Sequence, residues 1–353
     1  MKKLSYKEEK IKHFDPSGMA LPSDNIYGLP FTTAESDLVI IPVPWEVTVS
    51  YKKGTAQAPD RVREAAMQVD LYNPDAPDLW KMGISLEPVS KKWASANKKL
   101  RAKAEKYLDA LAAGENIDKK PLLKKNLAEI NAECRKLHTW VKEEVLHFIE
   151  EGKMVALLGG EHSTALGMIE ALAVKNKEFG ILQIDAHHDL RNAYEGFTYS
   201  HASIMYNALQ LPQVKKLTAV GIRDYGENEA SLVKHSRGRI SAFYDKDMAR
   251  DMNEGVQWKK ICKDIVATLP EKVYISFDID GLDPKNCPNT GTPVVGGLEY
   301  EQALYLIEAV IDSGKKIIGF DLNEVGDGEW DANVGARLLY RLSALFAKSA
   351  GKV

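Results

Sequence analysis

The segment DAHHDLR, residues 185–191, places two carboxylates and two imidazoles within five residues, directly after the apolar run GILQI. Ionised carboxylates that are crowded together at the end of a buried strand repel one another and lose their hydration. They therefore need a positively charged partner. This segment predicts that something positive is bound where the strand ends.

Three other apolar runs also end in acids or histidines. ALLGG leads to Glu161 and His162, YISF to Asp278, Asp280 and Asp283, and IIGF to Asp321 and Glu324. Functional groups of parallel α/β sheets lie beyond the carboxyl ends of the strands, so we expect all four sets at one edge of a sheet. A single acid at such a position commonly caps a helix, but four sets together favour a functional site.

The spacing of these residues indicates which of them can converge. Side chains of an extended segment alternate between two sides, so residues two apart share a side, and His188 falls out of phase with its neighbours. Two imidazoles and four carboxylates are too many ligands for one metal ion and suit two ions that share carboxylates. The candidate ligands are His162, Asp185, His187, Asp189, Asp278 and Asp280.

The chemistry of the ligand set indicates the kind of ion. Thiolates are missing from the set and carboxylate oxygens dominate it, which favours two Mn²⁺ ions, with Ni²⁺, Co²⁺ or Fe²⁺ as alternatives. Two such ions about 3.5–4 Å apart lower the pKa of a water molecule that they share, which makes hydroxide available at neutral pH. The sequence therefore predicts a binuclear metal centre.

The elements that must position these groups alternate regularly from residue 153 onward. Short apolar runs without in–out alternation are separated by helical patterns such as STALGMIEALAVK and EQALYLIEAVIDSG, and DLVIIPVP adds an earlier strand. Strands buried on both faces are typical of a parallel sheet between two layers of helices. We predict an α/β fold, a three-layer α/β/α arrangement with a central, mostly parallel sheet. The later runs are MVALLGG, FGILQIDA, KLTAVGI, KVYISFDID and KIIGFDL.

The rest of the chain fits one domain over residues 1–353. Residues 1–37 are predicted to be an irregular arm, residues 67–98 receive no firm assignment, and residues 99–150 are predicted to be a helical elaboration. Its second part, residues 121–151, has apolar residues three and four apart, as in one long amphipathic helix. Glu and Asp interrupt the lysine-rich stretch before it, which we interpret as a solvated helix face rather than a nucleic-acid site.

Composition excludes several classes of function. The chain has 353 residues and a net charge of −3, which gives no electrostatic reason to expect nucleic acid or an anionic membrane as partner. Its apolar stretches are too short for a transmembrane helix, and its start lacks the apolar part of a signal peptide. The three cysteines are far apart, as in proteins of reducing compartments. We therefore expect a cytoplasmic enzyme.

Four blocks, GGEHS, DAHHDLR, SFDIDGLDP with TGTPVVGGL, and DLNEV, resemble the signature blocks of the ureohydrolases, the family of arginase and agmatinase. The resemblance covers residues 38–345. It implies a manganese hydrolase that splits a guanidino group into urea and an amine, and a homo-oligomer, either trimer or hexamer. It places His162, Asp185, Asp189 and Asp278 on one ion and His187 and Asp280 on the other, with Asp185 and Asp278 shared.

The same resemblance assigns two further residues, and the chemistry supports each assignment. Glu324 matches the acid that binds the guanidinium, a permanent cation that a carboxylate can pair with and orient. His201 matches the histidine that shuttles protons, and the leaving amine needs a proton donor of this kind. Cys287 is close to the site in sequence, and we interpret it as a buried bystander. The turn VGDGEWD after Glu324 departs from the family pattern.

Substrate choice must come from the loop RNAYEGFTY, residues 191–199. Glu195, with the aromatic residues of the loop, could cage a cationic tail, whereas Arg191 could clamp a carboxylate or pair with Glu195 instead. The block is closer to agmatinases than to arginases, so we predict agmatine as the small-molecule substrate, with arginine, a guanidino acid or a formimino compound as alternatives. The aromatic residues are Tyr194, Phe197 and Tyr199.

Three other classes of protein compete with this interpretation. A deacetylase of similar architecture needs one metal ion, and a binuclear phosphatase would bring a glycine-rich phosphate cradle or a cluster of Arg and Lys. An inactive assembly or regulatory subunit is the non-enzyme alternative. It is disfavoured because every proposed ligand and both other catalytic positions are present.

Overall fold

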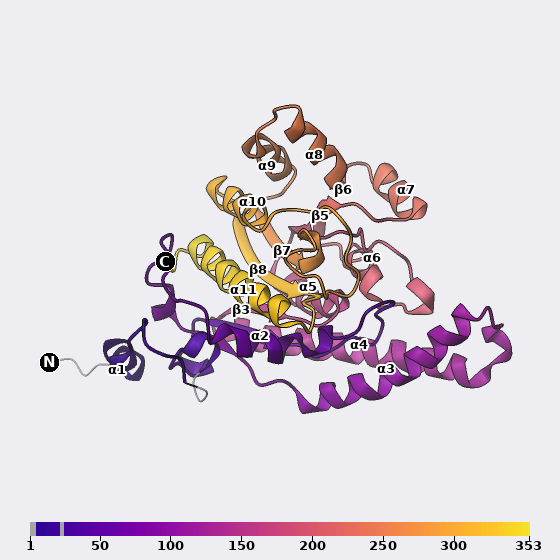
Figure 1. Ribbon diagram of the computed structural model, residues 1–353, viewed down its shortest axis with the longest axis horizontal. Helices are drawn as coiled ribbons and strands as arrows, with labels where there is room; N and C mark the ends of the chain where they lie inside the picture. The colour runs from indigo at the N-terminus through magenta and orange to yellow at the C-terminus, as the bar shows by residue number, and fades with distance from the viewer. Residues whose placement is uncertain (1–4, 22–24) are drawn as a thin grey trace.

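A single eight-stranded sheet forms the centre of the protein (Figure 1). The computed structural model describes residues 5–21 and 25–353. The strand order is β2-β1-β3-β8-β7-β4-β5-β6, and every strand pair in this described part is parallel. The strands are β1 Leu38–Pro42, β2 Ile84–Leu86, β3 Met154–Leu158, β4 Phe179–Ile184, β5 Val214–Ile222, β6 Ile240–Tyr244, β7 Lys272–Asp278 and β8 Lys316–Asn323.

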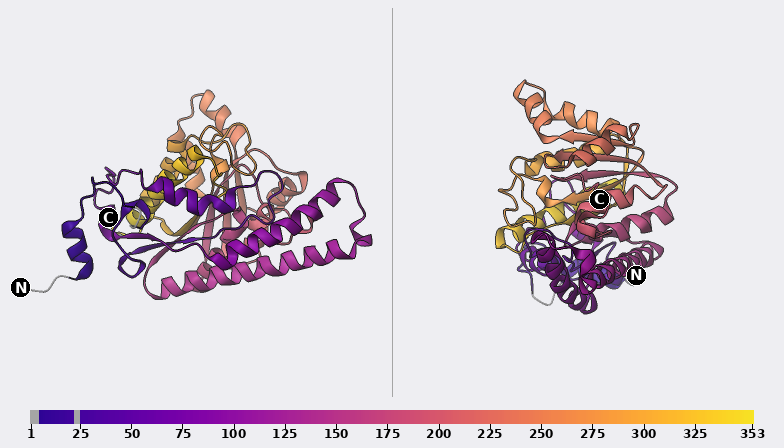
Figure 2. Two further views of the ribbon diagram at one scale, coloured as in Figure 1. Left: turned by 60° about the horizontal axis from the view of Figure 1, so that its bottom comes forward. Right: turned by 90° about the vertical axis from the view of Figure 1, so that its right-hand side faces the viewer.

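Helices cover both faces of this sheet, which confirms the predicted three-layer α/β/α fold (Figures 1 and 2). Alternate residues of one strand enter opposite cores: Ile40 packs with α2, α10 and α11, and Val39 packs with α3, α4 and α5. The helices are α1 Tyr6–His13, α2 Ala58–Ala66, α3 Lys91–Ala112, α4 Pro121–Glu150, α5 Ala165–Lys175, α6 Ile204–Ala208, α7 Glu227–His235, α8 Asp245–Asn253, α9 Trp258–Ala267, α10 Tyr300–Asp312 and α11 Glu329–Ser349.

The two edge strands, β2 and β6, were missed by the pattern of apolar runs. β2 has only three residues and lies in the segment that received no firm assignment. β6 is partly exposed along most of its length, so its sequence, ISAFY, lacks a fully apolar run. Edge strands have only one neighbouring strand, and their sequence signal is correspondingly weaker.

The prediction of an irregular arm over residues 1–37 was wrong at Tyr6–His13, which forms α1. Ser5 and Glu8 form a capping box at its start, a pattern that stabilises short helices. Lys10 pairs with Glu35 at 2.6 Å, which attaches the helix to the segment before β1. Residues 1–4 and 22–24 of the predicted arm lie outside the described residues.

The helical elaboration is a long hairpin of α3 and α4 that reaches beyond the sheet (Figure 2, left). α4 matches the predicted long helix, whereas α3 begins at Lys91 rather than at residue 99, because the Ser90 side chain accepts a hydrogen bond from the N–H of Trp93 and caps it there. Lys98, Lys99 and Lys106 of α3 are exposed, as expected for a solvated face. Among the described helices, none is long and apolar enough to cross a membrane. We propose that residues 1–353 form one domain around this sheet.

Candidate metal centre and active site

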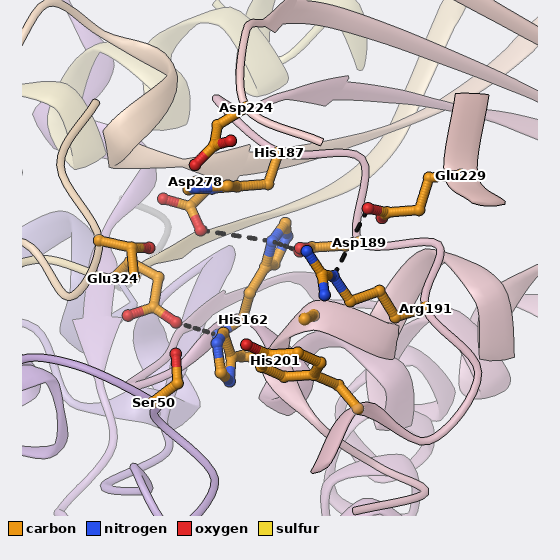
Figure 3. Close-up of a pocket in the computed structure, with 13 residues that line it drawn as sticks. Ser50, His162, His187, Asp189, Arg191, His201, Asp224, Glu229, Asp278 and Glu324 are labelled. Atoms are coloured by element: carbon orange, nitrogen blue, oxygen red, sulfur yellow. Dashed lines mark hydrogen bonds and ion pairs between the residues drawn. The ribbon is translucent and has the colours of Figure 1, made fainter. Parts of the chain in front are cut away.

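The strand order brings the four predicted groups of side chains together at one edge of the sheet. β3, β8, β7 and β4 are consecutive neighbours, although they are far apart in the chain. His162 follows β3, Asp185 follows β4, Asp278 ends β7 and Glu324 follows β8. Because all four strands are parallel, their carboxyl ends point the same way, and the side chains of His162, Asp278 and Glu324 line one cavity (Figure 3).

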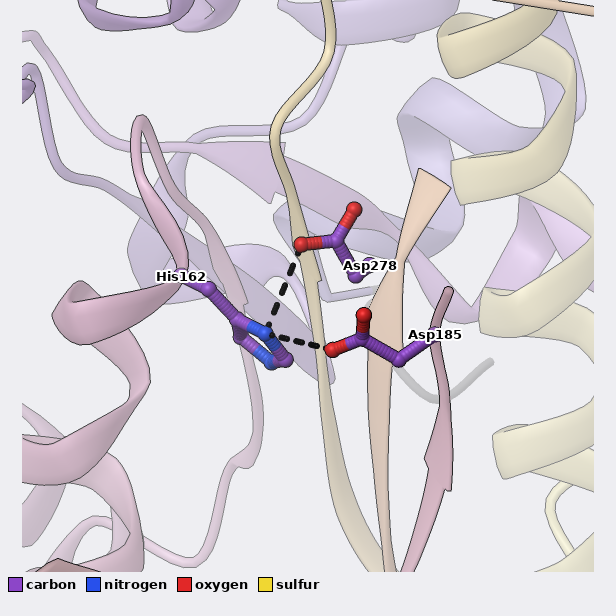
Figure 4. A group of neighbouring side chains, drawn as sticks. All are labelled: His162, Asp185 and Asp278. Atoms are coloured by element: carbon purple, nitrogen blue, oxygen red, sulfur yellow. Dashed lines mark ion pairs between the residues drawn. The ribbon is translucent and has the colours of Figure 1, made fainter. Parts of the chain in front are cut away.

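The first cluster forms around the imidazole of His162. Its Nδ1 atom lies 3.1 Å from Asp185 Oδ2, 3.0 Å from Asp189 Oδ2 and 3.4 Å from Asp278 Oδ2. Figure 4 shows the ring of His162 facing the carboxylates of Asp185 and Asp278. All four side chains are buried. One imidazole nitrogen and three carboxylate oxygens thus converge on a volume that one metal ion could fill.

The second cluster forms around His187 and shares Asp185 with the first. His187 Nδ1 lies 3.1 Å from Asp280 Oδ2 and 3.5 Å from Asp185 Oδ1. Asp185 therefore presents one oxygen to each imidazole, which is the geometry of a bridging carboxylate. Asp278 contributes Oδ2 to the first cluster, and its Oδ1 accepts a hydrogen bond from the N–H of Asp280 at 2.9 Å. The sharing of Asp278 stays a prediction.

The electrostatics of the clusters show an excess of negative charge. Burial and the neighbouring charges of Asp280 and Asp185 raise the pKa of Asp278 well above its usual range. Burial and the charge of Asp185 raise the pKa of Asp189 to about 7. Burial opposes ionisation of Asp185 too, but hydrogen bonds from His162 and His187 lower its pKa. Divalent cations would relieve this repulsion, so the residues fit a two-ion centre.

Polar residues inside the strands orient the ligands. His162 Nε2 lies 2.9 Å from Ser276 Oγ, and Ser276 Oγ in turn donates to Asp321 Oδ1 at 3.2 Å, so the other ring nitrogen faces the carboxylates. Gln183 Nε2 donates to Asp185 Oδ2 at 2.8 Å. Sequence analysis did not identify Ser276 and Gln183, although each is a polar residue in an otherwise apolar strand, two positions before a ligand. That spacing was the available signal.

Glu324 lines the same cavity as His162, His187 and Asp278 (Figure 3). Its Oε1 atom accepts a hydrogen bond from the backbone N–H of His162 at 2.8 Å. Its Oε2 atom is buried without a hydrogen-bond partner among the described residues. Burial and the charge of Glu161 raise its pKa well above the usual range. A buried carboxylate oxygen without a partner is a suitable site for a cationic group.

His201 lines the same cavity and is held by Thr48 and Ser200. Its backbone N–H donates to Thr48 Oγ1 at 3.1 Å, and its Nδ1 atom lies 3.3 Å from Ser200 Oγ. Burial and the positive charge of His187 lower the pKa of His201 to about 3, so its imidazole is neutral. Thr48 Oγ1 also donates to Glu161, whose pKa burial raises to about 7. Sequence analysis missed Thr48 because no motif marks the loop that carries it.

The loop predicted to select the substrate is arranged differently from the expectation. Arg191 lines the cavity, but its Nε atom pairs with Glu229 Oε2 at 3.5 Å, so the expected alternative partner, Glu195, was wrong. Glu229 is buried and also accepts hydrogen bonds from the N–H groups of Leu190 and Gly226. It sits in the first turn of α7, directly after Gly226, and no motif in the sequence marked it as part of the site.

The expected aromatic cage is present only in part. Tyr194 lines the cavity, and the guanidinium of Arg191 lies 4.5 Å from the centre of its ring. Phe197 is completely buried against Tyr107 of α3, and Tyr199 packs against His138 of α4. Both rings belong to the hydrophobic core beneath the loop, so they cannot enclose a substrate. Glu195 does not belong to the cavity lining that the described residues form.

Cys287 belongs to a structural contact rather than to the metal clusters. Its buried Sγ atom donates to Asp331 Oδ1 at 2.9 Å. Asp331 is the last residue of the segment VGDGEWD and also accepts from the backbone N–H of Asn289 at 2.8 Å. The turn is thereby tied to residues 287–289. This contact supports the interpretation of Cys287 as a bystander.

Comparison with known proteins identifies the family. The Arginase family matches residues 36–342, so the chain belongs to this family. It is 29% identical over 328 residues to an N(1)-aminopropylagmatine ureohydrolase of Synechocystis sp., covering 90% of this chain and 92% of the other. It is 29% identical over 292 residues to an agmatinase of Bacillus anthracis, covering 82% and 84%.

A crystal structure gives the same result for the fold. The agmatine ureohydrolase of Thermoplasma volcanium superimposes with a TM-score of 0.71, covering 98% of this chain and 99% of the other at 24% identity. The chain is thus a ureohydrolase of the Arginase family, a hydrolase that acts on guanidino C–N bonds, and the family depends on a binuclear metal centre. This confirms the predicted family and reaction class.

Proposed function

We propose that this protein hydrolyses agmatine to urea and putrescine with two Mn²⁺ ions. The observation that carries the proposal is the single cavity in which two histidine–carboxylate clusters, the unpartnered Glu324 Oε2 and the neutral His201 meet. The cavity has a volume of about 140 Å³, which suits a small, slender substrate rather than a macromolecule.

The donor set supports the choice of metal. We propose that His162, Asp189 and Asp278 hold one ion, that His187 and Asp280 hold the other, and that Asp185 bridges them, with Asp278 as the second shared ligand. Four carboxylates and two imidazoles are hard or borderline ligands that suit Mn²⁺. When bound, the two ions supply Lewis acidity and lower the pKa of water.

The protein's own residues bind the substrate and move the proton. Glu324 Oε2 would accept hydrogen bonds from the guanidinium, which satisfies its free acceptor and fixes the position of the guanidino carbon. The imidazole of His201 lines the same cavity as Glu324 and the metal ligands, so it is placed to take up a proton and deliver it to the amine as the C–N bond breaks. Thr48 and Ser200 hold the imidazole in place for this transfer.

Charge at the far end of the cavity favours a substrate with an amine tail. Arg191 is the cationic residue predicted to clamp a carboxylate, but it is already paired with Glu229, and Asp224 adds a further negative charge to the lining. The three side chains together carry a net charge of −1. An ammonium group is attracted by this end, whereas a carboxylate is not. Glu195 would attract the amine tail through its charge, without contacting it.

The test is urea release from a panel of guanidino compounds after loading with Mn²⁺. We expect kcat/KM for agmatine to exceed the values for arginine and 4-guanidinobutyrate by at least about tenfold, the effect of one favourable charge contact. N(1)-aminopropylagmatine belongs in the panel because a relative is named for it and because its longer tail is also cationic. A preference for arginine or 4-guanidinobutyrate would refute the amine-tail assignment.

Assembly and location complete the proposal. We propose a homo-oligomer, trimer or hexamer, in the cytoplasm. β2 and β6 are edge strands, which a neighbouring subunit could cover. A solution mass equal to one chain of 39.3 kDa at micromolar concentration would contradict the oligomer.

A further inference from the structure

The loop between Arg191 and His201 has an unusual backbone. Ala193, Glu195 and Gly196 have φ values of +55°, +53° and +85°, in the left-handed region. Two of these residues carry side chains, and such conformations cost free energy unless surrounding contacts fix them. The loop presents Tyr194 to the cavity and leads directly into His201. Two hydrogen bonds inside the loop, from the N–H groups of Gly196 and Phe197 to the carbonyl oxygens of Ala193 and Tyr194, hold part of this shape, and contacts from outside the loop add to them.

Asn131, which lies on α4, supplies two of these outside contacts. Its Nδ2 donates to the carbonyl oxygen of Gly196 at 3.1 Å, and its Oδ1 accepts from the N–H of Thr198 at 2.9 Å. The side-chain amide thus pairs with the loop backbone on both sides of Phe197. The approach is close, because a Cβ atom added to Gly196 would lie 2.8 Å from the hydroxyl of Tyr107 on α3.

α3 holds the other loop beside the cavity in a similar way. The guanidinium of Arg101 is buried and donates to the carbonyl oxygens of Val47 and Val49 at 3.1 and 2.6 Å. Between these two residues lies Thr48, which binds the backbone of His201, and just after them comes Ser50, which lines the cavity. Both loops therefore meet at His201.

We propose that the α3–α4 hairpin is a positioning element for the active site, with Asn131 and Arg101 as positioning residues. The hairpin reaches past the sheet (Figure 2), and its side chains contact the backbone of both loops. Both contacts run from a polar side chain to loop backbone, so they set geometry. A separate ion pair between Arg135 of α4 and Glu170 of α5 anchors the hairpin to the body, and the guanidinium of Arg135 also lies 6.0 Å from the centre of the Tyr199 ring in the loop. The catalytic part of this inference rests on the proposed function.

The test compares three variants of the full-length protein. Asn131→Asp has the same shape as the wild type but turns an oxygen toward the carbonyl of Gly196, so it replaces a hydrogen bond with repulsion. Asn131→Ala removes both hydrogen bonds. Glu143→Ala is the matched control, an exposed residue of the same helix. For each variant we would measure melting temperature, metal content, the rate of chymotryptic cleavage after Tyr194 or Tyr199, and kcat and KM for urea release.

We expect both Asn131 variants to retain metal and global stability while chymotrypsin cleaves the loop about tenfold faster. We expect kcat/KM to fall about 10- to 100-fold, since small displacements of positioned groups have effects of this size. The control should match the wild type in every measurement.

Wild-type behaviour of Asn131→Asp would overturn the inference, because it would show that only the shape of the side chain matters. Unchanged cleavage in Asn131→Ala would overturn it too, as would faster cleavage with unchanged kcat/KM. If Asn131→Ala does not fold, Asn131→Asp decides. The cleavage rate can be measured without enzymatic activity. If the wild type released no urea, the proposed function would be refuted, but the cleavage rates would still test whether Asn131 fixes the conformation of the loop.

Discussion

The two sides of the cavity are held by different means. On one side, the six proposed metal ligands lie at or after the ends of the parallel strands β3, β7 and β4, and Ser276 and Gln183 orient two of them from within the strands. On the other side, Tyr194 and His201 sit on a loop with left-handed residues, and side chains from α3 and α4 hold that loop and the one beside it.

The two sides of the cavity should therefore respond differently to substitutions. A strand end is fixed by many backbone hydrogen bonds, so replacing a ligand there should remove metal without moving the scaffold. A loop held by a few side-chain contacts should instead shift when one contact is lost, and metal should stay bound. The predictions below separate these two kinds of failure.

The largest effect is expected for Asp185→Ala. Asp185 offers one oxygen to each cluster, so its removal should weaken both metal sites at once. We expect activity to fall below detection and bound metal to fall from about two ions to less than one ion per chain. Metal analysis by plasma mass spectrometry, together with urea release, provides the measurement.

Asp283→Ala is the matched control for this variant. Asp283 follows the same strand as Asp278, but its carboxylate accepts from the N–H of Lys285 instead of facing the clusters. It should keep about two ions and most of its activity. If Asp185→Ala kept two ions per chain, the bridging role of Asp185 would be refuted.

The second largest effect is expected for His201→Asn, which tests the loop side. His201 lies outside both clusters, so we expect metal content to be unchanged while kcat falls about 10²- to 10⁴-fold through loss of proton transfer. His147→Asn, on the exposed surface of α4, should have no effect. Loss of metal from His201→Asn would show that the two sides of the cavity are not separable in this way.

The sequence predicted the strand side of the cavity better than the loop side. His162, Asp185 and Asp278 were predictable, because parallel strands place their carboxyl ends together whatever their order in the sheet. Glu229 and Thr48 were not, because their partners lie 38 or more positions away in the chain and only the folded structure brings them together. The edge strands β2 and β6 were missed for a local reason, since one is very short and the other is partly exposed.

The third prediction concerns the pH dependence of metal binding. Burial and the charge of Asp185 raise the pKa of Asp189 to about 7, and the hydrogen bonds of His162 to Asp185 and Asp189 outweigh burial and raise its pKa well above the usual range. Both groups must lose a proton before they bind an ion, so affinity for Mn²⁺ should increase as pH rises through neutrality. We expect the apparent Kd to fall about tenfold per pH unit for each proton released.

Titration calorimetry in buffers of different ionisation enthalpy would measure how many protons are released when Mn²⁺ binds. The loop side makes a contrasting prediction: the pKa of His201 is lowered to about 3, so His201 should add no proton to the count near neutrality. Equal proton release by the wild type and His201→Asn would sharpen the comparison. An affinity that does not change between pH 6.5 and 8 would contradict the assigned ligands.

The smallest effects are expected around Arg191 and Glu195 on the loop side, where we propose that the substrate tail binds. Glu195 is half-buried and outside the cavity lining, so it acts on a bound ammonium through charge alone. We expect Glu195→Gln to lower kcat/KM for agmatine by less than about threefold, as is usual for a charge without direct contact. Glu227→Gln, an exposed acid at the start of α7, is the matched control.

Arg191→Ala should leave agmatine turnover the same or slightly raise it, because Glu229 would then be free to attract the tail. If arginine or 4-guanidinobutyrate were instead the preferred substrate and Arg191→Ala weakened its turnover, Arg191 would have left Glu229 to bind a carboxylate. The loop would then select its substrate by exchanging ion-pair partners rather than by the net charge of its resting arrangement.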